Sequence, residues 1–161
     1  MTSDELPVTL EATAVYVLNA EHVCHDCGCL VPVFRVMLAG PFKGKADGFD
    51  LDEDDAPLLS YLNDLPPALV ELLTDSSLGY FRLDVSHTAG DSYWMNHCSE
   101  CDSKIGDWFI SRPGEAFFPT IDAEMAKVNG KHVPGPWVFT NPGLSVSSWT
   151  TYWLQQQSNG T

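Results

Sequence analysis

The sequence predicts a mainly β protein, a β-rich α+β fold in which an antiparallel sheet carries zinc-ribbon-like knuckles and a small helical insertion. Two observations support this prediction. Runs rich in β-branched and aromatic residues recur along the chain, as is typical of strands. Two such runs lead directly into C-x-x-C pairs, Cys24/Cys27 and Cys98/Cys101.

The first strand pair is predicted on the two sides of Cys24 and Cys27. Residues 13–18 (TAVYVL) form a strand that is apolar on both faces, and residues 30–38 (LVPVFRVML) form its partner. Pro32 stands near the start of the second strand, where a missing backbone donor does little harm. Strand, C-x-x-C-G turn and strand together have the form of a zinc knuckle.

The helical insertion is predicted between residues 58 and 73, after an acidic run over 47–55. We expect helices at 58–62 and 65–73, and the Pro66-Pro67 pair suits the first turn of the second helix. The acidic run begins like a calcium loop, but Asp55 replaces the glycine of the sharp turn and Tyr61 replaces the bidentate glutamate. A solvated acidic loop is therefore the expectation.

A second strand pair is predicted around Cys98 and Cys101. Residues 80–86 alternate cleanly, which predicts a half-buried strand with its apolar members inward. Residues 92–97 form its partner and residues 105–110 form a further strand. The inward side chains are expected to be Phe81, Leu83 and Val85.

The C-terminal part is less regular. Residues 121–128 fit a short helix or a strand, and Asn129-Gly130 carries the strongest two-residue hairpin signal. Short extended pieces containing Trp137, Trp149 and Trp153 should follow. At 161 residues the chain suits one core. We expect a single domain over 1–154 and a flexible polar tail over 155–161.

The cysteine pairs give the strongest functional signal. Two C-x-x-C pairs match the thiolate set of a closed tetrahedral zinc site, so Cys24, Cys27, Cys98 and Cys101 are the predicted ligands of one structural zinc ion. The fifth cysteine, Cys29, is left over. Four other side chains lie close enough in sequence to replace a cysteine ligand: His22, His25, Cys29 and His97.

Enzymatic activity has little support in the sequence. Four thiolates leave no coordination position for water. The segment from His97 to Cys101 resembles the zinc-deaminase pattern only loosely, because its spacing differs by one residue and no proline precedes Cys98. Acidic neighbours of the first pair disfavour a cysteine nucleophile. A non-enzymatic protein is the expectation, and a zinc-dependent enzyme, hydrolase or deaminase-like, is the alternative.

The charge balance restricts the partners. Eight Lys and Arg against twenty-two Asp and Glu give a net charge of −14, which repels phosphate backbones and anionic lipids. Direct nucleic-acid binding is disfavoured, and a basic protein partner is favoured, as for an inhibitor or immunity-type protein. No signal peptide or spanning segment is predicted, and the cysteine usage fits a reducing compartment. We expect a cytoplasmic protein without membrane contact.

One stretch also carries a resemblance. The motifs NHCSEC at 96–101, GDWF at 106–109 and FFP at 117–119 resemble an N-H-C-x-x-C…G-D-x-F…F-F-P signature in a group of uncharacterised bacterial and phage zinc-ribbon proteins. The resemblance implies zinc ligation by Cys98 and Cys101 and, by extension, by Cys24 and Cys27. It implies no activity.

Overall fold

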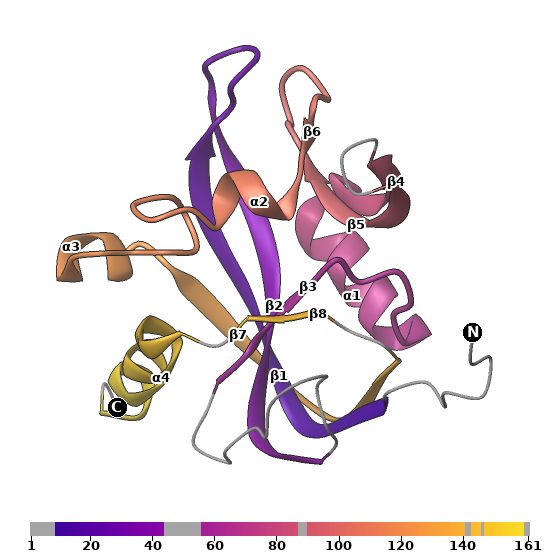
Figure 1. The fold of residues 1–161 in the computed structure, drawn as a ribbon, viewed down its shortest axis with the longest axis vertical. Coiled ribbons are helices and arrows are strands. Elements are labelled where there is room, and N and C mark those ends of the chain that lie inside the picture. Colours follow the sequence, from indigo (N-terminus) through magenta and orange to yellow (C-terminus); the bar gives the residue numbers. More distant parts are fainter. Residues whose placement is uncertain (1–8, 44–55, 87–89, 141–142, 146, 160–161) are drawn as a thin grey trace, which may run out of the picture.

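A computed structural model describes residues 9–43, 56–86, 90–140, 143–145 and 147–159. The predicted fold class is confirmed: the protein is mainly β, with antiparallel sheets and a few short helices (Figure 1). The acidic run over 47–55, with the calcium-loop pattern weighed for it, lies outside the described residues.

The larger sheet has five antiparallel strands in the order β7-β1-β2-β3-β8. Its centre is the long hairpin of β1 (Thr9–Val23) and β2 (Leu30–Lys43), whose register runs from Glu11↔Lys43 to Val23↔Leu30. The other strands are β3 (Leu58–Ser60), β7 (Asn129–Thr140) and β8 (Gly143–Ser145). The β1–β2 hairpin carries the first C-x-x-C pair at its tip.

The smaller sheet has three antiparallel strands, β4 (Phe81–Ser86), β5 (Asp91–His97) and β6 (Lys104–Ile105). The second C-x-x-C pair lies in the turn between β5 and β6. Four helices accompany the sheets: α1 (Pro67–Ser77), α2 (Asp107–Ile110), α3 (Asp122–Met125) and α4 (Ser148–Asn159). The tips of the β1–β2 and β5–β6 hairpins project side by side from one end of the molecule (Figure 1).

A buried asparagine connects the two sheets. The Phe34 backbone N–H on β2 donates to Asn96 Oδ1 at 2.7 Å, and Asn96 Nδ2 donates to the Phe34 carbonyl at 2.9 Å. The amide of Asn96 therefore pairs with β2 as a neighbouring strand would. This pairing fixes β5, and the cysteine pair that follows it, against the central hairpin.

The prediction of a helix over 65–73 is confirmed by α1, but two neighbouring predictions are wrong. Residues 58–60 form β3, because their leucines are buried between β2 and β8. Residues 105–110 are divided between the end of β6 and α2, because Asp107 turns the chain inward after the short strand.

Several C-terminal and surface predictions also need correction. Leu83 and Val85 are about half exposed, because the face of β4 that carries them has no covering layer among the described elements. Asn129-Gly130 begins β7 and pairs with β1, so it is no hairpin turn. Trp149 and Trp153 lie on α4. That helix continues to Asn159, into the segment for which we expected a flexible tail.

Candidate metal centre

The structure brings the four predicted ligands together at the tips of the two hairpins. The Sγ atoms of Cys24, Cys27, Cys98 and Cys101 all lie within 4.8 Å of one another. Cys24 Sγ is 3.7 Å from Cys101 Sγ, and Cys27 Sγ is 3.5 Å from Cys98 Sγ. Sulfur ligands about 2.3 Å from a tetrahedral zinc ion lie about 3.8 Å apart. The four thiols therefore fit a tetrahedral metal ion.

The two cysteine pairs are held by the same backbone geometry. In the first knuckle, Cys24 N–H donates to the Cys29 carbonyl and Gly28 N–H donates to the Cys24 carbonyl, both at 2.9 Å. In the second knuckle, Cys98 N–H donates to the carbonyl of Ser103 at 2.9 Å and Asp102 N–H donates to the Cys98 carbonyl at 2.8 Å. Two segments distant in sequence thus present matching pairs of sulfur atoms.

Each knuckle also needs one left-handed residue, directly after its second cysteine. The φ angles are +75° at Gly28 and +63° at Asp102. A Cβ on Gly28 would meet nothing within 4 Å, so the constraint there is conformational rather than steric. Glycine and, less readily, aspartate adopt this conformation, which explains the C-x-x-C-G and C-x-x-C-D forms of the two motifs.

Backbone N–H groups support the second pair of sulfurs. The N–H groups of Glu100 and Cys101 both point at Cys98 Sγ from 3.4 Å. Burial raises the pKa of the Cys98 thiol, and these donors oppose that rise. A hydrogen bond with Ser103 lowers the pKa of Cys101 to about 7. These contacts favour the thiolate form that binds a metal.

The centre is buried on one side and open on the other. Cys24 and Cys98 are buried among the hydrophobic residues below the knuckles, whereas Cys27 and Cys101 are exposed. A hydrogen bond from Ser103 Oγ to Asp26 Oδ2 links the two knuckles directly. Four protein thiolates complete a tetrahedral site and leave no position for water. The four thiols therefore supply a full tetrahedral ligand set for one metal ion.

The three histidines among the other candidate ligands are engaged elsewhere, and Cys29 lies beside Cys27 without joining the group of four. His97 Nε2 lies 2.7 Å from Asp84 Oδ2, and its Nδ1 faces two backbone carbonyls. His25 stacks on Phe109 with ring centroids 5.0 Å apart. His22 is buried beside Glu115, and Cys29 is exposed at the base of its knuckle. Within the described ranges, the metal-binding group contains the two cysteine pairs alone.

Sequence reasoning missed the roles of Asn96 and His97. Asn96 ties β5 to β2, and His97 connects β5 to β4 through Asp84. Both residues are about 1 % exposed. The signal available in the sequence was the polar Asn-His dipeptide directly before Cys98. Polar side chains at buried positions are almost always hydrogen-bonded, so this dipeptide pointed to a structural contact.

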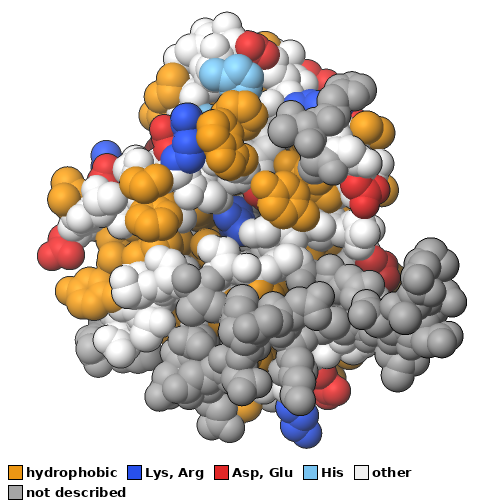
Figure 2. Space-filling model, viewed as in Figure 1, with side chains coloured by type: hydrophobic (Ala, Val, Ile, Leu, Met, Phe, Trp, Pro, Cys, Tyr) orange, Lys and Arg blue, Asp and Glu red, His pale blue; other side chains and the backbone are white. Residues whose placement is uncertain are grey.

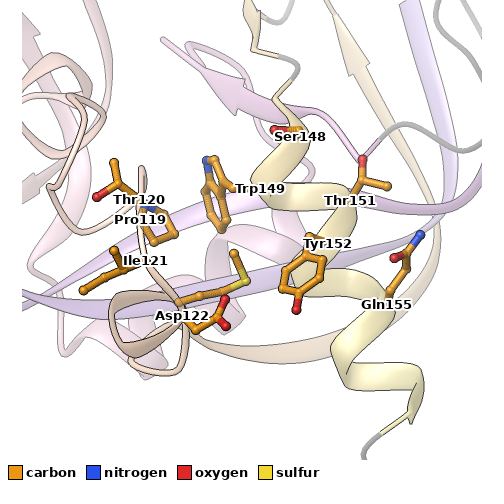
Figure 3. A pocket seen from close by; sticks show the side chains of 10 residues that line it. Pro119, Thr120, Ile121, Asp122, Ser148, Trp149, Thr151, Tyr152 and Gln155 are labelled. Atoms are coloured by element: carbon orange, nitrogen blue, oxygen red, sulfur yellow. The ribbon is translucent and has the colours of Figure 1, made fainter.

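Two of the hollows outside the metal centre are large enough to hold a small ligand. One, of about 820 Å³, is lined by aromatic and sulfur-containing side chains: Tyr61, Tyr93, Met95, Trp108 and Phe109. Figure 2 shows hydrophobic side chains gathered on that side of the molecule, beneath the knuckles. The other, of about 580 Å³, lies between α3 and α4, where Trp149 and Tyr152 face Ile121 and Asp122 (Figure 3). Among the described lining residues, neither hollow combines a nucleophile with a histidine base.

No family model matches the chain, and no significant match was found among the curated proteins or the solved structures. Among the described helices, none has both the length and the hydropathy required to cross a membrane.

Proposed function

We propose that the chain is a non-enzymatic interaction module stabilised by one structural zinc ion, and that its acidic surface binds a basic protein partner in the cytoplasm. Zinc fits the donor set because four thiolates in a tetrahedron are typical of structural zinc sites. The proposed site adds to the acidity, since four thiolates around one divalent cation carry a net charge of −2.

The net charge of −14 is the observation that carries this proposal. Several of the eight cations are engaged within the chain. Arg35 is buried, Arg82 pairs with Asp102 at 2.9 Å, and Lys104 lies 3.5 Å from Asp84. A surface with so few free cations attracts a basic protein over long range and repels nucleic acid.

An inhibitor or immunity-type role follows from the same electrostatics. A compact acidic domain competes with phosphate groups for a nucleic-acid-binding surface, because both present closely spaced negative charges. The knuckle end contributes exposed carboxylates next to the proposed zinc site, from Asp26, Glu100 and Asp102. This role requires a folded scaffold and no reacting group, which agrees with a metal site closed to water.

The proposal is tested with a fluorescent decalysine peptide at 50 and 200 mM NaCl. We expect binding that weakens steeply with salt, because each ion pair formed releases counterions. Binding should also weaken at least tenfold when the five acidic residues between 50 and 55 are changed to their amides. Changing Glu71 and Asp75 on α1 to Gln and Asn is the control for an acidic site elsewhere. Salt-insensitive binding, or equal binding by the fivefold variant, would refute the proposal.

A further inference from the structure

The last part of the β1 edge, near the tip of the central hairpin, has no neighbouring strand among the described residues. The pairing of β1 with β7 ends at Asn19↔Asn129, whereas the pairing of β1 with β2 continues to Val23↔Leu30. Over the described residues, no strand pairs with the other side of residues 20–23. Figure 1 shows the β1–β2 hairpin rising beyond the level of β7. A strand edge of this kind is a template for pairing with another chain.

A groove of about 420 Å³ runs beside this edge. Its lining includes the edge itself, from Ala20 to Val23, and the segment from Arg112 to Ala116. The groove therefore lies where a strand continuing the line of β7 would be placed. Its position is suited to an extended peptide.

A buried histidine lines the groove without a hydrogen-bond partner. His22 is 8 % exposed, and neither of its ring nitrogens makes a hydrogen bond to any described residue. Glu115 Oε2 approaches Nδ1 only to 3.5 Å. Buried polar atoms in folded proteins are almost always paired. The Glu115 carboxylate is the nearest such group to the His22 ring, so it orients the histidine in the groove wall.

The two faces at this edge differ in chemistry. Val23 and Leu30, a cross-strand pair, are 58 % and 59 % exposed on the outward face. On the His22 side, the carboxylates of Glu115 and Glu124 line the groove. Arg112 is held there by Glu115 at 3.8 Å and by the Trp108 ring, 4.6 Å from its guanidinium carbon. The groove lining as a whole has three carboxylates, from Glu21, Glu115 and Glu124, and two cations, Arg112 and Lys127. The exposed valine–leucine pair thus suits apolar side chains, and the groove has a small excess of acidic groups that favours basic ones.

We propose that an extended segment of the basic partner adds as a strand to the free edge of β1 at residues 20–23. Because side chains alternate along a strand, every second residue of the segment packs against Val23 and Leu30. The intervening residues place basic groups near Glu115 and Glu124. This inference rests on the proposed function and adds a surface that the partner uses besides the acidic residues between 50 and 55.

The test compares two peptides of equal charge, acetyl-KVKVKV-amide and acetyl-KPKPKP-amide, on the metal-loaded protein. Proline removes the backbone donors that strand addition needs, so we expect the proline peptide to bind at least tenfold more weakly. Amide hydrogen exchange should slow at residues 20–23 when the valine peptide binds. Val23→Thr should weaken valine-peptide binding several-fold. Val138→Thr, at an exposed β7 position, is the matched control and should leave it unchanged.

The outcomes separate this inference from the proposed function. Equal and salt-sensitive binding of both peptides, or unchanged exchange at residues 20–23, would overturn strand addition while leaving the basic partner in place. Binding of decalysine without binding of the valine peptide has the same consequence. Failure of every basic probe to bind overturns both proposals.

Discussion

Replacing Cys27, a proposed metal ligand, should destabilise the protein far more than replacing Cys29, an exposed cysteine two residues away. Cys27 belongs to the sulfur group and lies 71 residues from Cys98, whereas Cys29 is outside the group. By analogy with a disulfide that closes a loop of this length, a metal link between the knuckles contributes about 4 kcal/mol. That is a large part of the 5–15 kcal/mol typical of a whole domain. For a chain of this size, the expected fall in Tm is roughly 8–16 °C.

The assay is thermal unfolding of Cys27→Ser and Cys29→Ser, each with and without a strong zinc chelator, together with metal content by atomic emission. We expect one zinc per chain in wild type and in Cys29→Ser, and a lowered Tm for both after chelation. Cys27→Ser should start at the lower Tm and respond little to the chelator. Equal Tm values for the two variants, or full metal content in Cys27→Ser, would refute the four-cysteine centre.

Three other predictions concern the contacts around the centre. Asn96→Ala should lower the free energy of unfolding by about 2–5 kcal/mol in urea titrations, because it leaves the buried N–H and C=O of Phe34 unpaired; a loss below about 1 kcal/mol would contradict this. The hydrogen bond with His97 lowers the pKa of Asp84 from 3.8 to about 2. The stabilisation that the ionised Asp84 gives the folded state is therefore complete above about pH 4 and is lost between pH 4 and 2. Asp84→Asn should be less stable than wild type at pH 7, and its free energy of unfolding should change less between pH 4 and 2. Burial, with the nearby Asp107 carboxylate, raises the pKa of Tyr93 to about 12, so an absorbance titration should contain a phenol near pH 12 that disappears in Tyr93→Phe.

The sequence predicted the four clustered cysteines and the strands next to them because these features are local. A C-x-x-C pair between two β-rich runs determines its own turn, and the spacing of the sulfurs follows from that turn. The strands over 13–18, 30–38 and 92–97 therefore lie within β1, β2 and β5. The pairing of the two distant cysteine pairs was also predictable, since one tetrahedral metal ion requires four ligands.

The errors occurred where long-range packing decides the local conformation. The composition of residues 58–60 favours a helix, but these residues form β3. The reason is that they pair with β2 on one side and with β8 on the other. Asn129-Gly130 has strong turn propensity, yet it pairs with Asn19 and Leu18 at the start of β7. In both cases, pairing with strands far away in the sequence outweighs the local preference.

Two buried polar residues illustrate a further limit of sequence reasoning. Arg35 lies in the middle of an apolar run, where a charge is unexpected, and it is 2 % exposed. Its guanidinium donates to the Leu59 carbonyl at 2.9 Å and also to the hydroxyls of Ser60 and Ser111. Burial raises the pKa of Asp107, and the positive charge of Arg35 opposes that rise. Such a network is visible only after the fold has brought its members together.

The metal centre and the free edge of β1 belong to one mechanical unit. The first knuckle caps the hairpin that carries the edge, and the second knuckle leads through β6 into α2. Phe109 on α2 stacks on His25 of the first knuckle and also lines the groove beside the edge. A metal ion that joined the knuckles would therefore also restrain the wall of this groove that Phe109 forms. Replacing a cysteine of this group is therefore expected to weaken binding of the proposed partner at this edge, although none of the four cysteines belongs to the proposed binding surface.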